Sequence, residues 1–213
     1  MRVKSGSRNW PGIGGHRRRR ISAVLPLAAV WCAADVVAGT ADQAELLILR
    51  DAAERGDVRA QVEYADRLAT GRGAAPDERA ALEWWAKAAL AGHADAMVRV
   101  ADHLAEGRAV PSDPAKAVEL WRRAAARGHA GAMTRLARAL ESGQGVPANP
   151  AEAATWWRRA AEAGEPSAQF EWARRLEEGR GGQASSGEAK TWYERAAQQG
   201  VAAVLLDRAP TDY

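Results

Sequence analysis

Apolar and small side chains recur three or four positions apart along most of this chain, the spacing of one face of an α-helix. Over residues 58–70 they stand at Ala60, Tyr64 and Leu68. Gly71 follows, and glycine favours the left-handed conformation in which helices commonly end. The pattern therefore predicts a helix over about 58–70 that buries one face and stops at this glycine.

A second helix is predicted shortly after the first, because Ala81, Trp85 and Ala88 share one helical face. Asp77 stands just before this segment and has the side-chain oxygen that caps the first free amides of a helix. Gly92 would end it. Each helix is apolar on one face only, so the two must pack together and against further helices.

The helix pair repeats with a period of 36 residues. Turn glycines, core alanines, a core leucine position and a large aromatic position all keep this step. They are Gly56, Gly92, Gly128, Gly164 and Gly200; Ala65, Ala101, Ala137 and Ala173; Leu68, Leu104, Leu140 and Leu176; Trp85, Trp121, Trp157 and Tyr193. Repetition at this period is typical of solenoid proteins, in which each unit stacks on its neighbours.

The sequence thus predicts an all-α fold, an α-solenoid of four 36-residue helix-turn-helix repeats with a half-repeat as N-terminal cap. The predicted units span 57–92, 93–128, 129–164 and 165–200, and the half unit spans about 43–55. The solenoid as a whole would cover 43–207, with 201–207 beginning a fifth unit and 208–213 forming a C-terminal tail.

One long motif is similar to a known repeat. A-x-x-W-W-x-x-A-A-x-x-G-H-A-x-A-M, at Ala81 to Met97, recurs nearly intact at Ala117 to Met133. With the loop pattern L-x-x-G-x-G/A-V-x-x-D/N-P-x-x-A, it closely resembles the Sel1-like repeat, a relative of the tetratricopeptide repeat. The resemblance covers all four units and implies that the first helices line a concave surface that holds partner segments. The fourth loop, 179–186, departs from the motif and is expected to be the loosest.

Residues 1–38 differ from the rest of the chain. Seven basic residues lie in the first 20 positions, and 14 largely apolar residues follow from Ile21 to Ala34. A basic segment, an apolar stretch too short to span a bilayer and then small residues are typical of a secretory signal. We predict export to the periplasm or beyond after cleavage, with 39–42 as a short linker. The alternatives are an uncleaved inner-membrane anchor, a basic nucleic-acid arm or a start codon assigned too early.

Charge and cysteine content narrow the function further. The chain has a net charge of +3, but residues 39–213 have 23 basic and 26 acidic residues, a net of −3. The basicity therefore belongs to the leader, and we expect no nucleic-acid partner and no membrane contact except through an uncleaved leader. Cys32 is the single cysteine, so an internal disulfide and a cysteine-based zinc site are both excluded.

The chain has few candidates for chemistry. His93 and His129 share one repeat position just after a turn glycine, which indicates a turn role rather than a ligand or base, and His103 is expected on the surface. No metalloprotease, hydrolase or phosphate-loop motif occurs. We predict no catalytic residue, metal or cofactor. Because cysteine-rich relatives have been linked to cell-wall and β-lactam compounds, an enzyme of that kind is the second hypothesis, weakened by the missing cysteines.

The more informative surface is the stripe of the first helices opposite their core stripe. One position of this stripe is mostly apolar and its neighbour changes charge halfway along the chain. The two positions read Val62, Val98, Thr134 and Phe170, and Asp66, Asp102, Arg138 and Arg174. We interpret them as a groove with an apolar floor that holds a protein or peptide partner. The alternative is that small residues are merely tolerated where the helices curve tightly. The predicted function is a non-enzymatic adaptor, scaffold or regulator in the bacterial cell envelope.

Overall fold

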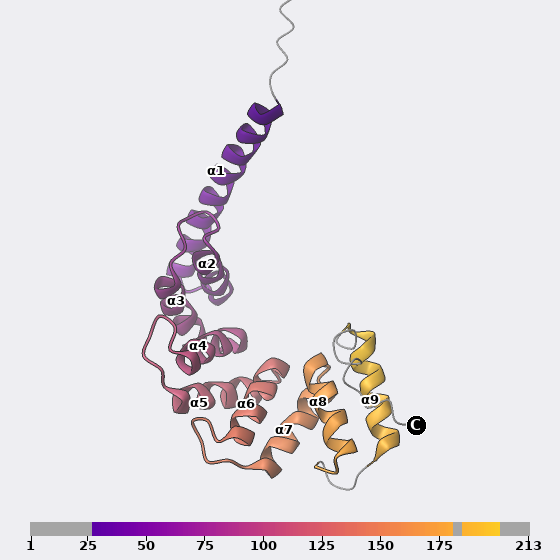
Figure 1. The fold of residues 1–213 in the computed structure, drawn as a ribbon. Helices are drawn as coiled ribbons and strands as arrows, with labels where there is room; N and C mark the ends of the chain where they lie inside the picture. The colour runs from indigo at the N-terminus through magenta and orange to yellow at the C-terminus, as the bar shows by residue number, and fades with distance from the viewer. Residues whose placement is uncertain (1–26, 181–184, 201–213) are drawn as a thin grey trace, which may run out of the picture. The chain divides into compact units, whose positions relative to one another are not determined.

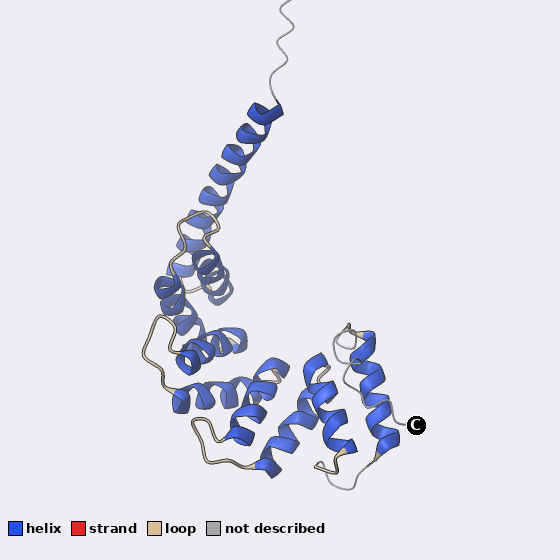
Figure 2. Ribbon diagram, viewed as in Figure 1, coloured by secondary structure: helices blue, strands red, loops and turns tan. Residues whose placement is uncertain are grey.

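The computed structural model describes residues 27–180 and 185–200, with side chains from residue 41 onward. These residues form nine α-helices and, within these ranges, no strand (Figures 1 and 2). The helices are α1 (Leu27–Glu54), α2 (Val58–Thr70), α3 (Glu78–Leu90), α4 (Ala94–Glu106), α5 (Pro114–Ala125), α6 (Ala130–Ser142), α7 (Pro150–Glu162), α8 (Pro166–Glu177) and α9 (Ser186–Gln198). The predicted all-α solenoid is confirmed. Three predicted features lie outside the described residues: most of the leader, the centre of the fourth loop and everything after residue 200.

The ends of the helices follow the predicted capping pattern. Asp77, Asp113 and Asn149 precede the second helices, and each side chain accepts a hydrogen bond from the amide three residues later, at 2.9–3.1 Å. Gly71 ends α2 in the left-handed conformation, with φ of 75°. His129 caps α6 in the same manner, because its Nδ1 accepts from the amide of Ala132 at 3.0 Å. The turn role predicted for this histidine is therefore that of a helix cap.

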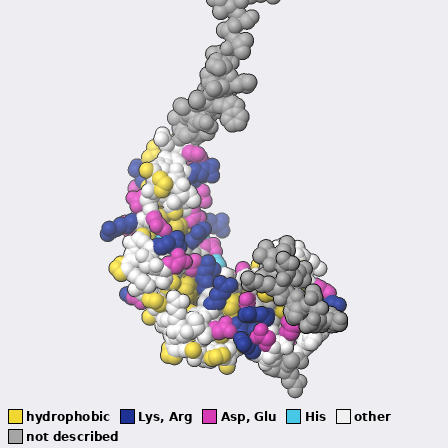
Figure 3. All heavy atoms as spheres, in the orientation of Figure 1, with side chains coloured by type: hydrophobic (Ala, Val, Ile, Leu, Met, Phe, Trp, Pro, Cys, Tyr) yellow, Lys and Arg dark blue, Asp and Glu magenta, His cyan; other side chains and the backbone are white. Residues whose placement is uncertain are grey.

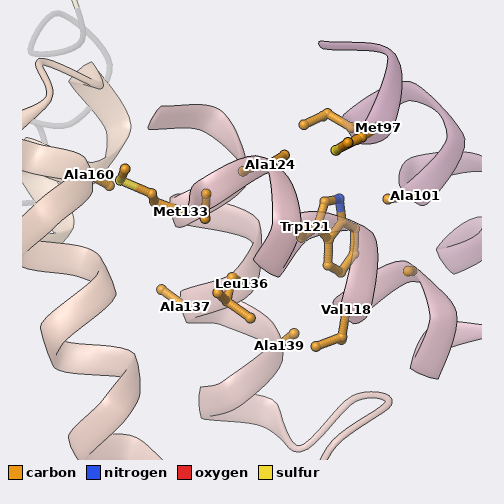
Figure 4. Packing of buried hydrophobic residues seen from close by; sticks show 14 of the residues in the cluster. Met97, Ala101, Val118, Trp121, Ala124, Met133, Leu136, Ala137, Ala139 and Ala160 are labelled. Atoms are coloured by element: carbon orange, nitrogen blue, oxygen red, sulfur yellow. The ribbon is translucent and has the colours of Figure 1, made fainter. Parts of the chain in front are cut away.

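Alanine and tryptophan positions build the core between the helix pairs. α2 packs on α3, α4 on α5, α6 on α7 and α8 on α9, and each second helix also packs on the first helix of the next unit. The core alanines are almost all inaccessible, which lets the helix backbones approach closely. Trp121 projects from α5 into the space beside Ala101 of α4 (Figure 4), and Trp157 is only 1% exposed. Trp85 lies 5.4 Å from the ring of His103 and Trp157 lies 5.1 Å from Arg175, each in the next unit, so these tryptophans also fill the space between units.

The end of α1 takes the place of a second helix that precedes the first complete unit. Arg72 pairs with Asp42 at 3.0 Å, and 36 residues later Arg108 pairs with Glu78 at 3.4 Å. The amide of Gln61 likewise donates to the carbonyl of Ala53, a contact that recurs in the last unit. Residues 42–54 thus dock on unit 1 as the second helix of a half unit.

Residues 39–42, predicted as a short linker, are helical and belong to α1. Helix formation is cooperative, and the docked half unit directly after them lets the same helix extend backwards. The chain divides into two units, residues 1–38 and 39–213, and the repeats all belong to the second. Among the described helices, none combines the length and the apolar character needed to cross a membrane.

Candidate functional site: the exposed face of the first helices

The predicted floor of the groove is largely covered. Val98 and Thr134 are only 6% and 5% exposed, and Val62 is half-buried against the core. Phe170 is also half-buried, with its ring 5.1 Å from that of Tyr193. The expectation that this position faces solvent is therefore wrong for the two middle units. Each first helix there is packed by a second helix on both sides, which leaves only a narrow strip exposed.

We call the exposed strip the first-helix face. It is made of charged residues from all four units, at the predicted charged position and at positions three and seven residues before it. Its members are Arg59, Glu63, Asp66, Asp95, Arg99, Asp102, Arg135, Arg138, Glu171 and Arg174. Figure 3 shows basic and acidic side chains interspersed over the described surface. Four of the predicted groove residues belong to this face: Asp66, Asp102, Arg138 and Arg174.

The two aspartates are bound within the protein. Trp85 donates its indole N–H to Asp66, and Trp121 donates to Asp102, each at 3.0 Å. Asp102 also pairs with the Nε of Arg135 in the next unit at 2.7 Å. These aspartates were predicted to line the groove that holds a partner, but their carboxylates already position a core tryptophan and link two units.

Arginines replace these aspartates in units 3 and 4. Arg174 pairs with Glu171 of its own helix at 2.6 Å. Burial would lower the pKa of Arg174, but the carboxylates of Glu171, Glu178 and Glu141 outweigh it and raise that pKa. Arg138 lies 5.8 Å from the centre of the Trp157 ring and forms no ion pair among the described residues. Arg138 and Arg59 are thus exposed basic groups of this face that form no ion pair within the described residues.

In units 3 and 4 the carboxylate near the core aromatic residue lies one helical turn later along the first helix, at Glu141 and Glu177. Tyr193 donates its hydroxyl to Glu177 at 3.1 Å, and burial together with this contact raises the pKa of the tyrosine. Glu141 instead binds Arg175, a buried residue of the next unit. Burial would raise the pKa of Glu141, but the hydrogen bond and charge of Arg175 outweigh it and lower that pKa. The buried indole N–H of Trp157 lies near Glu141 without forming a well-aligned hydrogen bond.

A hollow of about 230 Å³ opens on the first-helix face between α4 and α6. It is lined by Asp95, Val98, Arg99, Asp102, His129 and Arg135. His129 joins the two helices, because its Nε2 lies 2.8 Å from Asp95 while its Nδ1 accepts the capping bond of α6. With Nδ1 accepting, Nε2 carries the proton and donates to the aspartate. The sequence identified Val98 and Asp102 here but missed the other four, which the helical spacing of Asp95, Arg99 and Asp102 could have indicated.

His103 corrects another prediction. It was expected on the surface, but it is only 4% exposed, and its Nδ1 and Nε2 lie 2.8 and 3.0 Å from the carbonyl of Arg99 and the carboxylate of Glu78. Arg67 and Arg175 occupy the same repeat position and are also buried, so this position fastens one unit to the preceding one. No cluster of three or more metal-binding side chains occurs in the described part of the chain.

Comparison with known proteins agrees with the repeat. The family model for the Sel1 repeat matches residues 58–93, 94–129, 130–165 and 166–201, one residue later than the predicted units. A comparison with curated proteins gives no match.

Solved structures give the same fold. The chain is similar to c5321, described as a protective antigen of uropathogenic Escherichia coli with an SLR fold, at 34% identity over 73% of this chain, with a TM-score of 0.69. It spans only 33% of that longer protein. A Sel1 repeat protein from Oxalobacter formigenes is 25% identical, with a TM-score of 0.73 over 78% of this chain and 68% of its own.

Proposed function

This chain belongs to the Sel1 repeat family, and we propose that it is a non-enzymatic interaction module whose first-helix face holds a segment of a partner protein. Sel1 repeat proteins generally bind protein partners and generally lack enzymatic activity. The observation that carries the proposal is the hollow between α4 and α6, which lies among fixed charges of both signs. An extended partner segment crossing it would meet Arg99 and Arg138 as well as Asp95.

Several contacts support a binding role for this face. Asp102 and Arg135 hold each other in place at 2.7 Å, and His129 holds Asp95 at 2.8 Å, so these side chains are ordered before a partner arrives. Ordering in advance reduces the entropy that association must overcome. Charges at the edge of an interface mainly select the partner and speed the encounter, which suits an adaptor.

A pull-down compares this face with the opposite one. The full chain and an Arg99→Glu, Arg138→Glu variant would serve as baits for an envelope extract of the source organism. The control is Arg79→Glu, Arg123→Glu, which makes the same charge change at exposed residues of α3 and α5. We expect a partner that the wild type and the control retain and the first variant loses. Equal recovery on all three baits would reject the first-helix face, and circular dichroism would confirm that each bait is folded.

We further propose that the protein acts in the cell envelope, as an adaptor, scaffold or regulator. The support is the order of basic, apolar and small segments in residues 1–38. The intact mass of the protein purified from the envelope tests this proposal. A chain beginning near residue 39 is expected for a periplasmic or secreted protein. A chain that keeps its leader in the membrane fraction would instead make it an inner-membrane-anchored scaffold, and recovery from the cytosol would reject both.

A further inference from the structure

A second hollow, of about 460 Å³, lies between the second helices α7 and α9 rather than on the first-helix face. Residues from three helices line it. The lining residues are Arg158 and Glu162 from α7, Trp172 and Leu176 from α8, and Glu188, Thr191, Trp192 and Arg195 from α9. Trp172 and Leu176 are buried and form an apolar base, whereas the charged residues stand at the rim.

The same site exists one repeat earlier, where it is closed by an ion pair. Between α5 and α7, Arg122 binds the Oε1 of Glu152 at 2.5 Å, and the indole of Trp156 donates to that same oxygen at 3.3 Å. The arginine's hydrogen bond is the main reason that the pKa of Glu152 is lowered. Thus, when this position is closed, an arginine occupies it and shares one glutamate oxygen with a tryptophan indole.

Glu162 explains why the later site is open. Arg158, Glu188 and Trp192 stand 36 residues after Arg122, Glu152 and Trp156, so the same ion pair is available in principle. However, Arg158 pairs with Glu162 of its own helix at 2.8 Å, where the earlier site has Ala126. Within the described residues, Glu188 is left without a basic partner.

We propose that the α7/α9 pocket binds an arginine side chain presented by a partner protein. The guest guanidinium would bind Glu188 as Arg122 binds Glu152, next to the indole of Trp192. An arginine suits this site better than a lysine, because its planar fork binds a carboxylate through two N–H groups and also packs against aromatic rings. Arg195 already lies 4.5 Å from the Trp192 ring, so this ring accepts such packing. The pocket is separate from the first-helix face, so either proposal can fail without the other.

The test uses the full chain with ¹⁵N-labelled tryptophans and N-acetyl-L-arginine amide as the probe. The indole N–H signal of Trp192, assigned with Trp192→Phe, is expected to shift saturably on titration. N-acetyl-L-citrulline amide, which has the same shape without the charge, should bind about fivefold or more weakly, since a charge-assisted hydrogen bond at a partly exposed site is worth on the order of 1 kcal/mol. Absence of a saturable shift would overturn the proposal.

Two variants separate this site from nonspecific binding. Glu188→Gln removes the carboxylate that would bind the guest arginine. Glu162→Ala frees Arg158 to form an ion pair with Glu188, which closes the pocket. Both should abolish the saturable shift. The matched control, Glu152→Gln, changes the closed site and should leave the shift at Trp192 intact. If probe binding survived in either pocket variant, the assignment would be wrong, and circular dichroism would verify that all three variants are folded.

Discussion

Units 1 and 2 differ from units 3 and 4 in the polar contact made by the aromatic side chain at one repeat position. Trp85 and Trp121 donate to an aspartate one helix away. The buried indole N–H of Trp157 makes no well-aligned hydrogen bond, and Tyr193 donates to a glutamate one turn further on. The aromatic side chain keeps its place although its polar partner changes. Burying a large ring stabilises the folded protein more than a single hydrogen bond does. Packing therefore fixes the position of the ring, and the polar contact can vary.

The largest expected effect tests that ranking directly. Trp157→Ala and Trp121→Ala should each lower the free energy of unfolding by about 3–5 kcal/mol, because each leaves a cavity between units. Trp157 is 1% exposed and Trp121 8%, so Trp157→Ala should cost at least as much although it removes no hydrogen bond. Urea unfolding measures both. A clearly smaller loss for Trp157→Ala would show that the hydrogen bond, not the packing, dominates.

Glu141 provides the next largest effect and a pH dependence. Glu141→Gln should cost about 1–2 kcal/mol at pH 7, because it removes the charge that compensates buried Arg175. The pKa of Glu141 lies below its ordinary value of 4.5 in the folded protein, so its contribution is present at neutral pH and is lost as the pH falls below that value. The difference between wild type and variant should therefore shrink in acid.

Glu177→Gln is the matched control for Glu141→Gln, since Glu177 is exposed and holds only the Tyr193 hydroxyl. It should change the free energy of unfolding by less than about 0.5 kcal/mol. Urea unfolding at several pH values compares the two. A difference between wild type and Glu141→Gln that stays constant from neutral to acid pH would contradict the assigned role of the ion pair.

A smaller effect isolates the hydrogen bond itself. Trp121→Phe removes a donor from Asp102, whereas Trp157→Phe removes a buried N–H that has no partner. Both lose similar volume, so Trp121→Phe should be more destabilising by about 1 kcal/mol. Thermal unfolding of the pair measures the difference. An equal loss in both variants would mean that the indole of Trp157 is in fact hydrogen-bonded.

The smallest expected effect concerns the loops of the two halves. Ala109, between α4 and α5, has φ of 60°, while Gly145 holds the equivalent place between α6 and α7 with φ of 77°. A side chain is strained in this conformation, so Ala109→Gly should stabilise the protein by about 0.5–1 kcal/mol. Gly145→Ala should do the opposite, because its added methyl group would collide with the carbonyl of Pro114. Differential scanning calorimetry would reveal both, and destabilisation by Ala109→Gly would refute the strain.

The sequence predicted the repeat, the helix bounds of the complete units and their caps, because these depend on local spacing and on Asp77, Asn149 and the turn glycines. Exposure was harder to predict. Val98, Thr134 and His103 lie on flanks that only neighbouring helices cover, and a helical wheel drawn for one helix does not include those neighbours. The link between His129 and Asp95 was missed for the same reason, since it joins two units.

Inter-unit bonds such as those of Arg175 to Glu141 and His129 to Asp95 join residues 34 positions apart. These contacts therefore connect each unit only to its neighbour. Pulled from one end, such a protein should give way unit by unit, at similar forces, rather than in a single rupture. The terminal unit would then separate first, while the middle units keep their contacts with one another.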